Sequence, residues 1–209
     1  AKDILSKVDE ESKNIIENPE LKLNLSSKTK NGKIIVDQGV VAGCAGGTFE
    51  NIIAMAQIMK NKTIGNTEFS LSIYPSSQPV YLELVKNNTI SKLMQTGSII
   101  RSAFCGPCFG AGDVPSNKGF SIRHTTRNFP HREGSKPGQH QISSVALMDA
   151  RSVAATAINN GILTPANQID FDFDIIKYNF DQILWNDRRC LRYPHHLYHF
   201  VHLDIGDLI

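Results

Sequence analysis

Residues 33–60, KIIVDQGVVAGCAGGTFENIIAMAQIMK, contain the pattern that decides the fold. The first nine are rich in β-branched residues and predict a strand, which runs into a turn of small residues around Cys44. Thr48 is placed to cap a helix over residues 49–60, where the apolar side chains recur at helical spacing. A strand that passes through a tight turn into a capped helix is the repeating unit of an α/β sheet.

The same alternation of strand and helix continues along the chain. Asp149 is placed to cap an alanine-rich helix, and Gly161 stands where that helix is expected to end. Repeated strand–loop–helix units predict an α/β fold in three layers, α/β/α, around a largely parallel sheet. Ligands of such sheets bind where strands end, and both cysteine-bearing loops lie at such ends. The further strands are expected at residues 68–74, 98–104 and 119–124, and the further helices at 80–86, 89–94 and 150–160.

Three segments differ in composition. Residues 1–32 are polar, with apolar residues at near-helical spacing, and are expected to form an N-terminal helix and linker. Residues 33–170 are expected to form the α/β domain. Residues 171–209 are interpreted as a tail, either a linker or a non-native end, and the latter interpretation is favoured. In the tail, Cys190 is expected to be a free thiol, and His195, His199 and His202 would share one face if helical and could bind a metal.

The composition excludes several classes of protein. With 209 residues the chain has room for one or two domains, and 41% hydrophobic residues rule out a wholly disordered chain. Twenty-two basic residues against twenty acidic ones give a net charge of +2, which suggests neither nucleic acid nor a membrane surface as partner. No apolar run approaches the ~18 residues of a membrane span, and nothing at the N-terminus indicates secretion. We therefore expect a cytoplasmic protein, whose four cysteines are too few for a disulfide scaffold.

Cys105-Gly106-Pro107-Cys108 is the strongest local signal for chemistry. A C-x-x-C pair serves either as a redox dithiol or as two ligands of one metal centre. The tetrapeptide matches the thioredoxin active site, but a Gly/Pro-rich loop follows it where thioredoxin-like proteins have a helix. Cys44 adds a third thiol at a comparable loop position, and three sulfur ligands suit zinc or an iron–sulfur cluster. A missing fourth protein ligand would leave the open position of a catalytic metal site.

Residues 123–140 form a basic stretch in which histidines are interleaved. Such a run is commonly a solvated loop. It is also suited to bind carboxylate or phosphate, because arginine offers a planar fork and a loop can converge several forks on one anion. Thr126 and Asn128 could add neutral hydrogen bonds to a cluster sulfur or a substrate hydroxyl. The basic residues are Arg123, Arg127, Arg132 and Lys136, with His124, His131 and His140 between and after them.

Four motifs, in order, resemble those of the aconitase and isopropylmalate isomerase family. Residues 43–51, GCAGGTFEN, are similar to the turn that carries the family's first cluster cysteine. Residues 105–108, CGPC, are similar to its second cluster motif and follow at close to the family's spacing. Residues 126–132, TRNFPHR, look like its N-R-N-F-x-G-R, and residues 147–157, LMDARSVAATA, resemble its helix L-A-S-P-E-V-V-A-A-S-A. The ordered set covers about residues 34–164.

The resemblance implies an aconitase-type iron–sulfur domain that holds a [4Fe–4S] cluster. The fourth iron, without a protein ligand, would act as a Lewis acid. The reaction would be the reversible dehydration and hydration of a hydroxy di- or tricarboxylic acid. The implied metal ligands are Cys44, Cys105 and Cys108, the implied carboxylate-binding residues are Arg127 and Arg132, and Thr126 and Asn128 would lie in the cluster environment.

The chain also departs from the family. Thr126 stands where the family has Asn, and His131 stands where it has Gly before the second Arg. The family's His–Asp pairs and its serine base have no counterpart in the sequence, so the catalytic base is expected on another domain. We therefore interpret the chain as the third-domain piece of a longer hydro-lyase, inactive alone. Its expected partners are the remaining aconitase-type domains and a small carboxylic acid.

Two other functions stay open. The first is a non-catalytic remnant that binds a cluster or zinc and senses iron or oxidation. The second is a thiol oxidoreductase that uses Cys105 and Cys108, against which the loop context argues.

Overall fold

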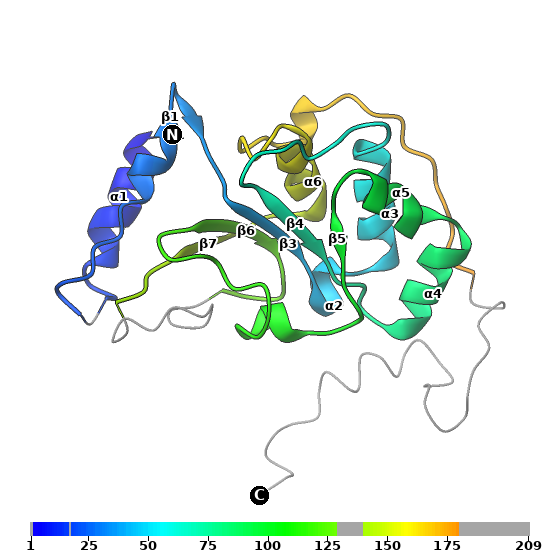
Figure 1. Ribbon diagram of the computed structural model, residues 1–209, viewed down its shortest axis with the longest axis horizontal. Coiled ribbons are helices and arrows are strands. Elements are labelled where there is room, and N and C mark those ends of the chain that lie inside the picture. The colour runs from blue at the N-terminus through cyan, green and yellow to red at the C-terminus, as the bar shows by residue number, and fades with distance from the viewer. Residues whose placement is uncertain (1, 17, 129–139, 180–209) are drawn as a thin grey trace, which may run out of the picture. The chain divides into compact units, whose positions relative to one another are not determined.

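The computed structural model describes residues 2–16, 18–128 and 140–179. Five strands form a parallel sheet in the order β5-β4-β3-β6-β7, with β3 at its centre (Figure 1). This sheet with its helices confirms the predicted α/β class and has the arrangement of a three-layer α/β/α domain. The strands are β3 (Gln38–Val41), β4 (Ser70–Ile73), β5 (Ile99–Ile100), β6 (Phe120–His124) and β7 (Ser144–Leu147).

The helices begin at the caps that the sequence predicts. The Thr48 hydroxyl accepts a hydrogen bond from the backbone of Asn51 at the start of α3. The Asp149 carboxylate accepts two backbone hydrogen bonds at the start of α6. Helix α6 packs on β3, β6 and α3, so one face of the sheet is covered by helices (Figure 1). The helices are α3 (Phe49–Ile58), α4 (Gln78–Lys86), α5 (Thr89–Gln95) and α6 (Ala150–Ile158).

Residues 101–118 cover the opposite face of the sheet. Side chains alternate between faces along a strand, so neighbours on β6 point in opposite directions. A Cβ placed on Gly39 would meet Val153 of α6, so Gly39 points to the face of the sheet that α6 covers. Arg123 pairs in register with Val40, the next residue of β3, and its guanidinium bonds to carbonyls of the loop. The segment after β5 therefore lies on the face opposite α6, and it contains the short helix η2 (Gly106–Cys108).

Several boundaries differ from the sequence expectation. The strand expected at residues 98–104 ends after Ile100, and β7 has no counterpart among the expected strands. The strand expected at 33–41 is split, because its first part pairs back on the preceding residues as a hairpin. The turn of that hairpin is Asn31-Gly32, both with positive φ, as a two-residue hairpin turn requires. The hairpin strands are β1 (Thr29–Lys30) and β2 (Lys33–Ile34).

The chain divides into two compact units, Ala1–Lys177 and Tyr178–Ile209. The five-stranded sheet and its helices lie in the first unit, which begins with α1 (Lys2–Ser12) and η1 (Leu25–Lys28) and ends with η4 (Ala166–Gln168). The expectations for Cys190 and for the histidines of the tail fall outside the described residues. In the described part of the chain, no helix has the length and apolar character needed to cross a membrane.

Candidate metal centre

The candidate centre lies where the strand order reverses. From β3 the chain proceeds to β4 on one side, and from β6 it proceeds to β7 on the other. Such a reversal leaves a crevice at the carboxyl ends of the two central strands, where ligands of α/β sheets bind. Helix α2 (Gly43–Gly46) directly follows β3 and carries Cys44, and Thr126 lies two residues after β6. Topology alone therefore brings these two residues to one place.

The Thr126 hydroxyl oxygen lies between two of the predicted ligand sulfurs. It is 3.8 Å from the sulfur of Cys44 and 3.9 Å from the sulfur of Cys108. Both separations are within sulfur hydrogen-bonding range, so a single hydroxyl contacts thiols from two different short helices, α2 and η2. The structure thus brings together residues that are 82 and 18 positions apart in the sequence.

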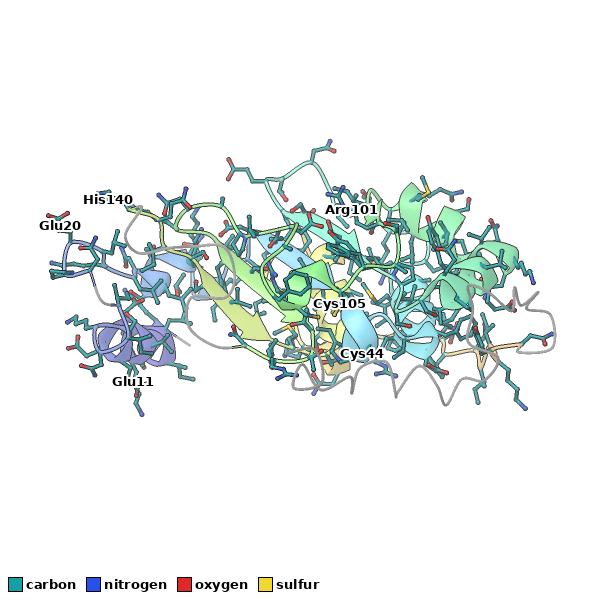
Figure 2. The ribbon with its side chains drawn as sticks, turned by 90° about the horizontal axis from the view of Figure 1, so that it is seen from below. Glu11, Glu20, Cys44, Arg101, Cys105 and His140 are labelled. Atoms are coloured by element: carbon teal, nitrogen blue, oxygen red, sulfur yellow. The ribbon has the colours of Figure 1, made fainter. Side chains whose placement is uncertain are left out.

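Cys105, the third predicted ligand, lies beside Gly43 together with Cys108. A Cβ at position 43 would stand 2.6 Å from the sulfur of Cys108 and 3.5 Å from that of Cys105. The backbone there has φ +72°, a conformation that glycine adopts without strain. Figure 2 shows Cys44 and Cys105 at the same part of the molecule, and both are exposed, whereas Cys108 is buried. The missing side chain therefore leaves space for the sulfur of Cys108.

The donor chemistry of the three thiols suits an iron–sulfur cluster, because such clusters are held by soft cysteine thiolates. Among the described residues, no three His, Cys, Asp or Glu side chains lie close enough to share one metal ion.

Short backbone contacts fix the turn that carries Cys44. The Ala42 amide donates to the carbonyl of His124 at 3.1 Å, which ties the turn to the end of β6. The side-chain amide of Asn51 donates to the carbonyls of Ala45 and Gly46, at 2.9 and 3.2 Å. The last turn of α2 is therefore closed by a side chain of the next helix.

The predicted carboxylate-binding residues are placed less completely. Arg127 is exposed and follows Thr126 directly, on the loop that leaves β6. Asn128 donates its amide to the carbonyl of Val145 at 2.7 Å, so it is bonded to β7. Arg132 lies outside the described residues, as do His131 and Lys136.

Three members of the basic stretch do not lie together in one loop. Arg123 is fully buried within β6, and His124 is half-buried at its end. His140 is exposed and lies beside Glu20, with 3.9 Å between their nitrogen and oxygen, and Figure 2 shows it away from the cysteines. The interpretation of these three residues as parts of one anion-binding loop is wrong.

Tyr74, Arg101 and Asp113 form a hydrogen-bonded polar group after β4 and β5, which the sequence did not indicate. The Tyr74 hydroxyl donates to the carboxylate of Asp113, which also pairs with Arg101 at 3.2 Å. Burial, together with the bond to Asp113, raises the pKa of Tyr74 to about 12. Burial alone would raise the pKa of Asp113, but the bonds from Tyr74 and Arg101 outweigh it and lower that pKa. Asp113 therefore stays ionised while Tyr74 stays protonated, and their hydrogen bond links the end of β4 to the loop.

His124 makes stability depend on pH. Its Nδ1 accepts a hydrogen bond from the Ala150 amide at 3.0 Å, which requires a neutral ring. Burial lowers the pKa of His124, and nearby Arg151 adds to that effect while Asp149 opposes it. The unfolded chain therefore takes up this proton first as the pH falls below the ordinary value near ~6.5. Folding stability is expected to fall between pH 7.5 and 5.5, by about 1 kcal/mol if the Ala150 bond is lost.

The substitution His124→Asn supplies the control for this prediction. Its amide oxygen can accept the same hydrogen bond from Ala150 but does not titrate in this range. Urea unfolding at pH 7.5, 6.5 and 5.5 should show a smaller loss of stability in the variant than in the unmodified chain. An equal loss in both would mean that His124 is not the group responsible.

Known proteins match the chain over most of its described length. The model of the aconitase family (aconitate hydratase) matches residues 2–155. The 3-isopropylmalate dehydratase large subunit of Caldanaerobacter subterraneus subsp. tengcongensis is 32% identical over 148 residues, 70% of this chain and 34% of that protein. The same subunit of Clostridioides difficile is 33% identical over 138 residues, 65% of this chain and 31% of that protein. The chain spans about a third of the length of the curated relatives it matches.

Proposed function

The chain belongs to the aconitase family, and on that premise we propose that it is the cluster-binding part of a longer hydro-lyase. The family resemblance carried by the four motifs is thereby confirmed. The proposal rests above all on one observation at the switch point of the sheet: the Cys44 and Cys108 sulfurs lie beside the Thr126 hydroxyl, and the Cys108 and Cys105 sulfurs lie beside Gly43. Its substrate class is a hydroxy di- or tricarboxylic acid.

Each residue of the centre has a proposed task. Cys44, Cys105 and Cys108 would hold a [4Fe–4S] cluster; of these thiols, Cys108 is buried and the other two are exposed. When bound, such a cluster supplies a Lewis acid that makes a substrate hydroxyl a better leaving group. The Thr126 hydroxyl lies within hydrogen-bonding distance of the sulfurs of both Cys44 and Cys108, and its single proton can be donated to one of them.

Substrate contacts are proposed for the exposed side of the centre. Arg127 offers its guanidinium to a substrate carboxylate, for which a planar fork is suited. Arg132 is proposed for the same role on the strength of its motif position alone. The catalytic base and the rest of the substrate pocket are proposed to come from the remaining aconitase-type domains. Cytoplasmic location stays part of this proposal.

The thiol oxidoreductase alternative gains no support from the geometry. A low thiol pKa in a C-x-x-C pair comes from a cysteine at the start of a helix. Cys105 instead precedes η2, a 3-10 helix of three residues, and the chain then continues as a loop. A helix that short supplies little of the dipole that would stabilise a thiolate.

Anaerobic reconstitution tests the proposal directly. With iron and sulfide supplied, the chain is expected to bind about four of each and to show a broad absorption band near ~400 nm. Cys44→Ser, Cys105→Ser and Cys108→Ser should each lower the iron content, because each removes one of three protein ligands. Iron and acid-labile sulfide per chain are the quantities to measure.

Cys190→Ser is the matched control, since this cysteine lies outside the family motifs and should leave the iron content unchanged. Full iron content in all three ligand variants would refute the ligand assignment. Uptake of zinc without iron would instead favour the alternative function, a non-catalytic remnant that binds zinc and senses iron or oxidation.

A further inference from the structure

Arg123 is a fully buried arginine in the middle of a β-strand. None of its surface is exposed, and its neighbours on β6 include the equally buried Ile122. Removing a guanidinium from water is strongly unfavourable unless its N–H groups find partners. A strand position facing a protein core would ordinarily carry an apolar residue. The partners of Arg123 must therefore explain why a charge is tolerated there.

Those partners fall into two sets. On the sheet, its Nε donates to the Ser121 hydroxyl at 3.0 Å and its Nη2 to the amide oxygen of Gln38 at 3.1 Å. On the loop, its Nη1 donates to the carbonyl of Pro107 at 3.1 Å and its Nη2 to the carbonyl of Asp113 at 2.6 Å. One side chain thus joins two strands to two points of the loop.

The loop contacts bracket the second cysteine of the motif. Pro107 is the residue immediately before Cys108, and Asp113 lies five residues after it. This loop is rich in glycine and proline, so few of its carbonyls are paired in regular structure, and buried carbonyls need donors. The fixed fork of arginine reaches acceptors in several directions at once, which lysine cannot do. The orientation of Cys108 toward Gly43 therefore depends on a side chain that comes from the sheet.

We propose that Arg123 is a positioning residue that locks the Cys105–Cys108 loop onto the sheet, so that its thiols face Gly43 before any metal binds. This deepens the proposed function, because it assigns the preorganisation of the ligand set to a residue outside the family motifs. A loop held this way binds a cluster without first having to become ordered. Arg123 therefore holds the loop in the metal-free chain as well as in the metal-loaded one.

The test compares Arg123→Lys with Ile122→Ala in the complete chain without metal. Arg123→Lys keeps the charge but loses the fork, so the loop carbonyls lose donors while the sheet stays intact. Ile122→Ala is the matched control: it lies on the same strand, is equally buried and points to the opposite face. Alkylation by iodoacetamide is followed at each cysteine by tandem mass spectrometry, with Cys44 as the internal reference.

The ratio of the Cys108 rate to the Cys44 rate is expected to rise about tenfold in Arg123→Lys, because local opening of the loop becomes easier. Ile122→Ala should lower the melting temperature but leave this ratio within about twofold of the unmodified chain, since its effect is on global stability. An unchanged ratio in Arg123→Lys would overturn the proposal, and so would an equal rise in the control.

Gln38→Leu provides a second, milder variant, because it removes one acceptor and leaves Arg123 and the loop carbonyls in place. Its ratio should lie between those of the unmodified chain and Arg123→Lys. After reconstitution, iron release to a chelator should be about tenfold faster in Arg123→Lys, as expected for a less preorganised site. If the chain binds no iron, the proposed function fails while the alkylation ratio still decides the role of Arg123.

Discussion

Gly43→Ala is expected to deprive the chain of most of its iron while leaving it folded. A side chain at φ +72° costs about 1–2 kcal/mol, because the left-handed conformation brings Cβ against the backbone. The larger effect is steric, since the new Cβ would stand 2.6 Å from the sulfur of Cys108 and 3.5 Å from that of Cys105. The Cys108 sulfur must move, because 2.6 Å is too short for any contact with a Cβ, and the positions of the ligand sulfurs relative to one another then change. Iron and sulfide per chain after reconstitution measure the result.

Gly32→Ala separates the two causes. Gly32 has φ +74°, almost the same backbone conformation, but nothing lies within 4 Å of the position its Cβ would take. Its substitution should cost a similar amount, about 1–2 kcal/mol for the left-handed conformation, and leave the iron content unchanged. If Gly43→Ala retains the iron of the unmodified chain, the iron is not held by the cysteines beside Gly43. If Gly32→Ala also loses iron, the loss does not come from the contact with the Cys108 sulfur.

The parts of the fold with strong local signals could be predicted from the sequence. The strand before Cys44 and the helix after it combine β-branched residues, a small-residue turn and a capping Thr48, and each signal supports the same assignment. The Asp149 cap is equally local, because the carboxylate bonds amides two and three residues away. β5 occupies only two residues of the strand predicted at residues 98–104, and β7 was not predicted. Runs this short carry little periodicity of their own, so their bounds depend on pairing with neighbouring strands.

The candidate site was predictable as a set of residues but not as an arrangement. The cysteines could be found from the family motifs, while the contact of Thr126 with two sulfurs depends on β3 and β6 being neighbours. The sequence predicts a strand at residues 119–124 and also counts Arg123 in the basic stretch, because composition does not show which strand residues are buried. The parallel register pairs Arg123 with Val40, and this position in the sheet buries the Arg123 side chain completely. Strand order and register are long-range properties, which local patterns do not contain.

Gly46→Ala is expected to lower the free energy of unfolding more than Gly43→Ala or Gly32→Ala. A Cβ at this position would lie 1.9 Å from the carbonyl oxygen of His124 and 2.8 Å from its carbonyl carbon. These are backbone atoms at the end of β6, so no flexible side chain can move aside. Relief requires the last turn of α2 to move away from the central sheet, at a cost of about 3 kcal/mol or more. Urea unfolding of the metal-free chain measures this loss.

Ala45→Gly is the control for this second substitution, because it changes the neighbouring residue of the same short helix by the reverse exchange. It should cost about 1 kcal/mol, the usual difference between alanine and glycine in a helix. A cost for Gly46→Ala no greater than that of the control would show that α2 is not pressed against β6.

The two glycine substitutions should also differ in how they affect the metal. The carbonyl of His124 that excludes a side chain at position 46 also accepts the amide of Ala42, so one oxygen fixes both ends of the cysteine turn. A displaced α2 moves Cys44 away from Thr126, yet leaves Cys105 and Cys108 on their own loop. Gly46→Ala should therefore lose global stability and iron together, whereas Gly43→Ala loses iron at a smaller cost in stability. Iron per folded chain, measured for both variants, distinguishes a displaced turn from obstructed thiols.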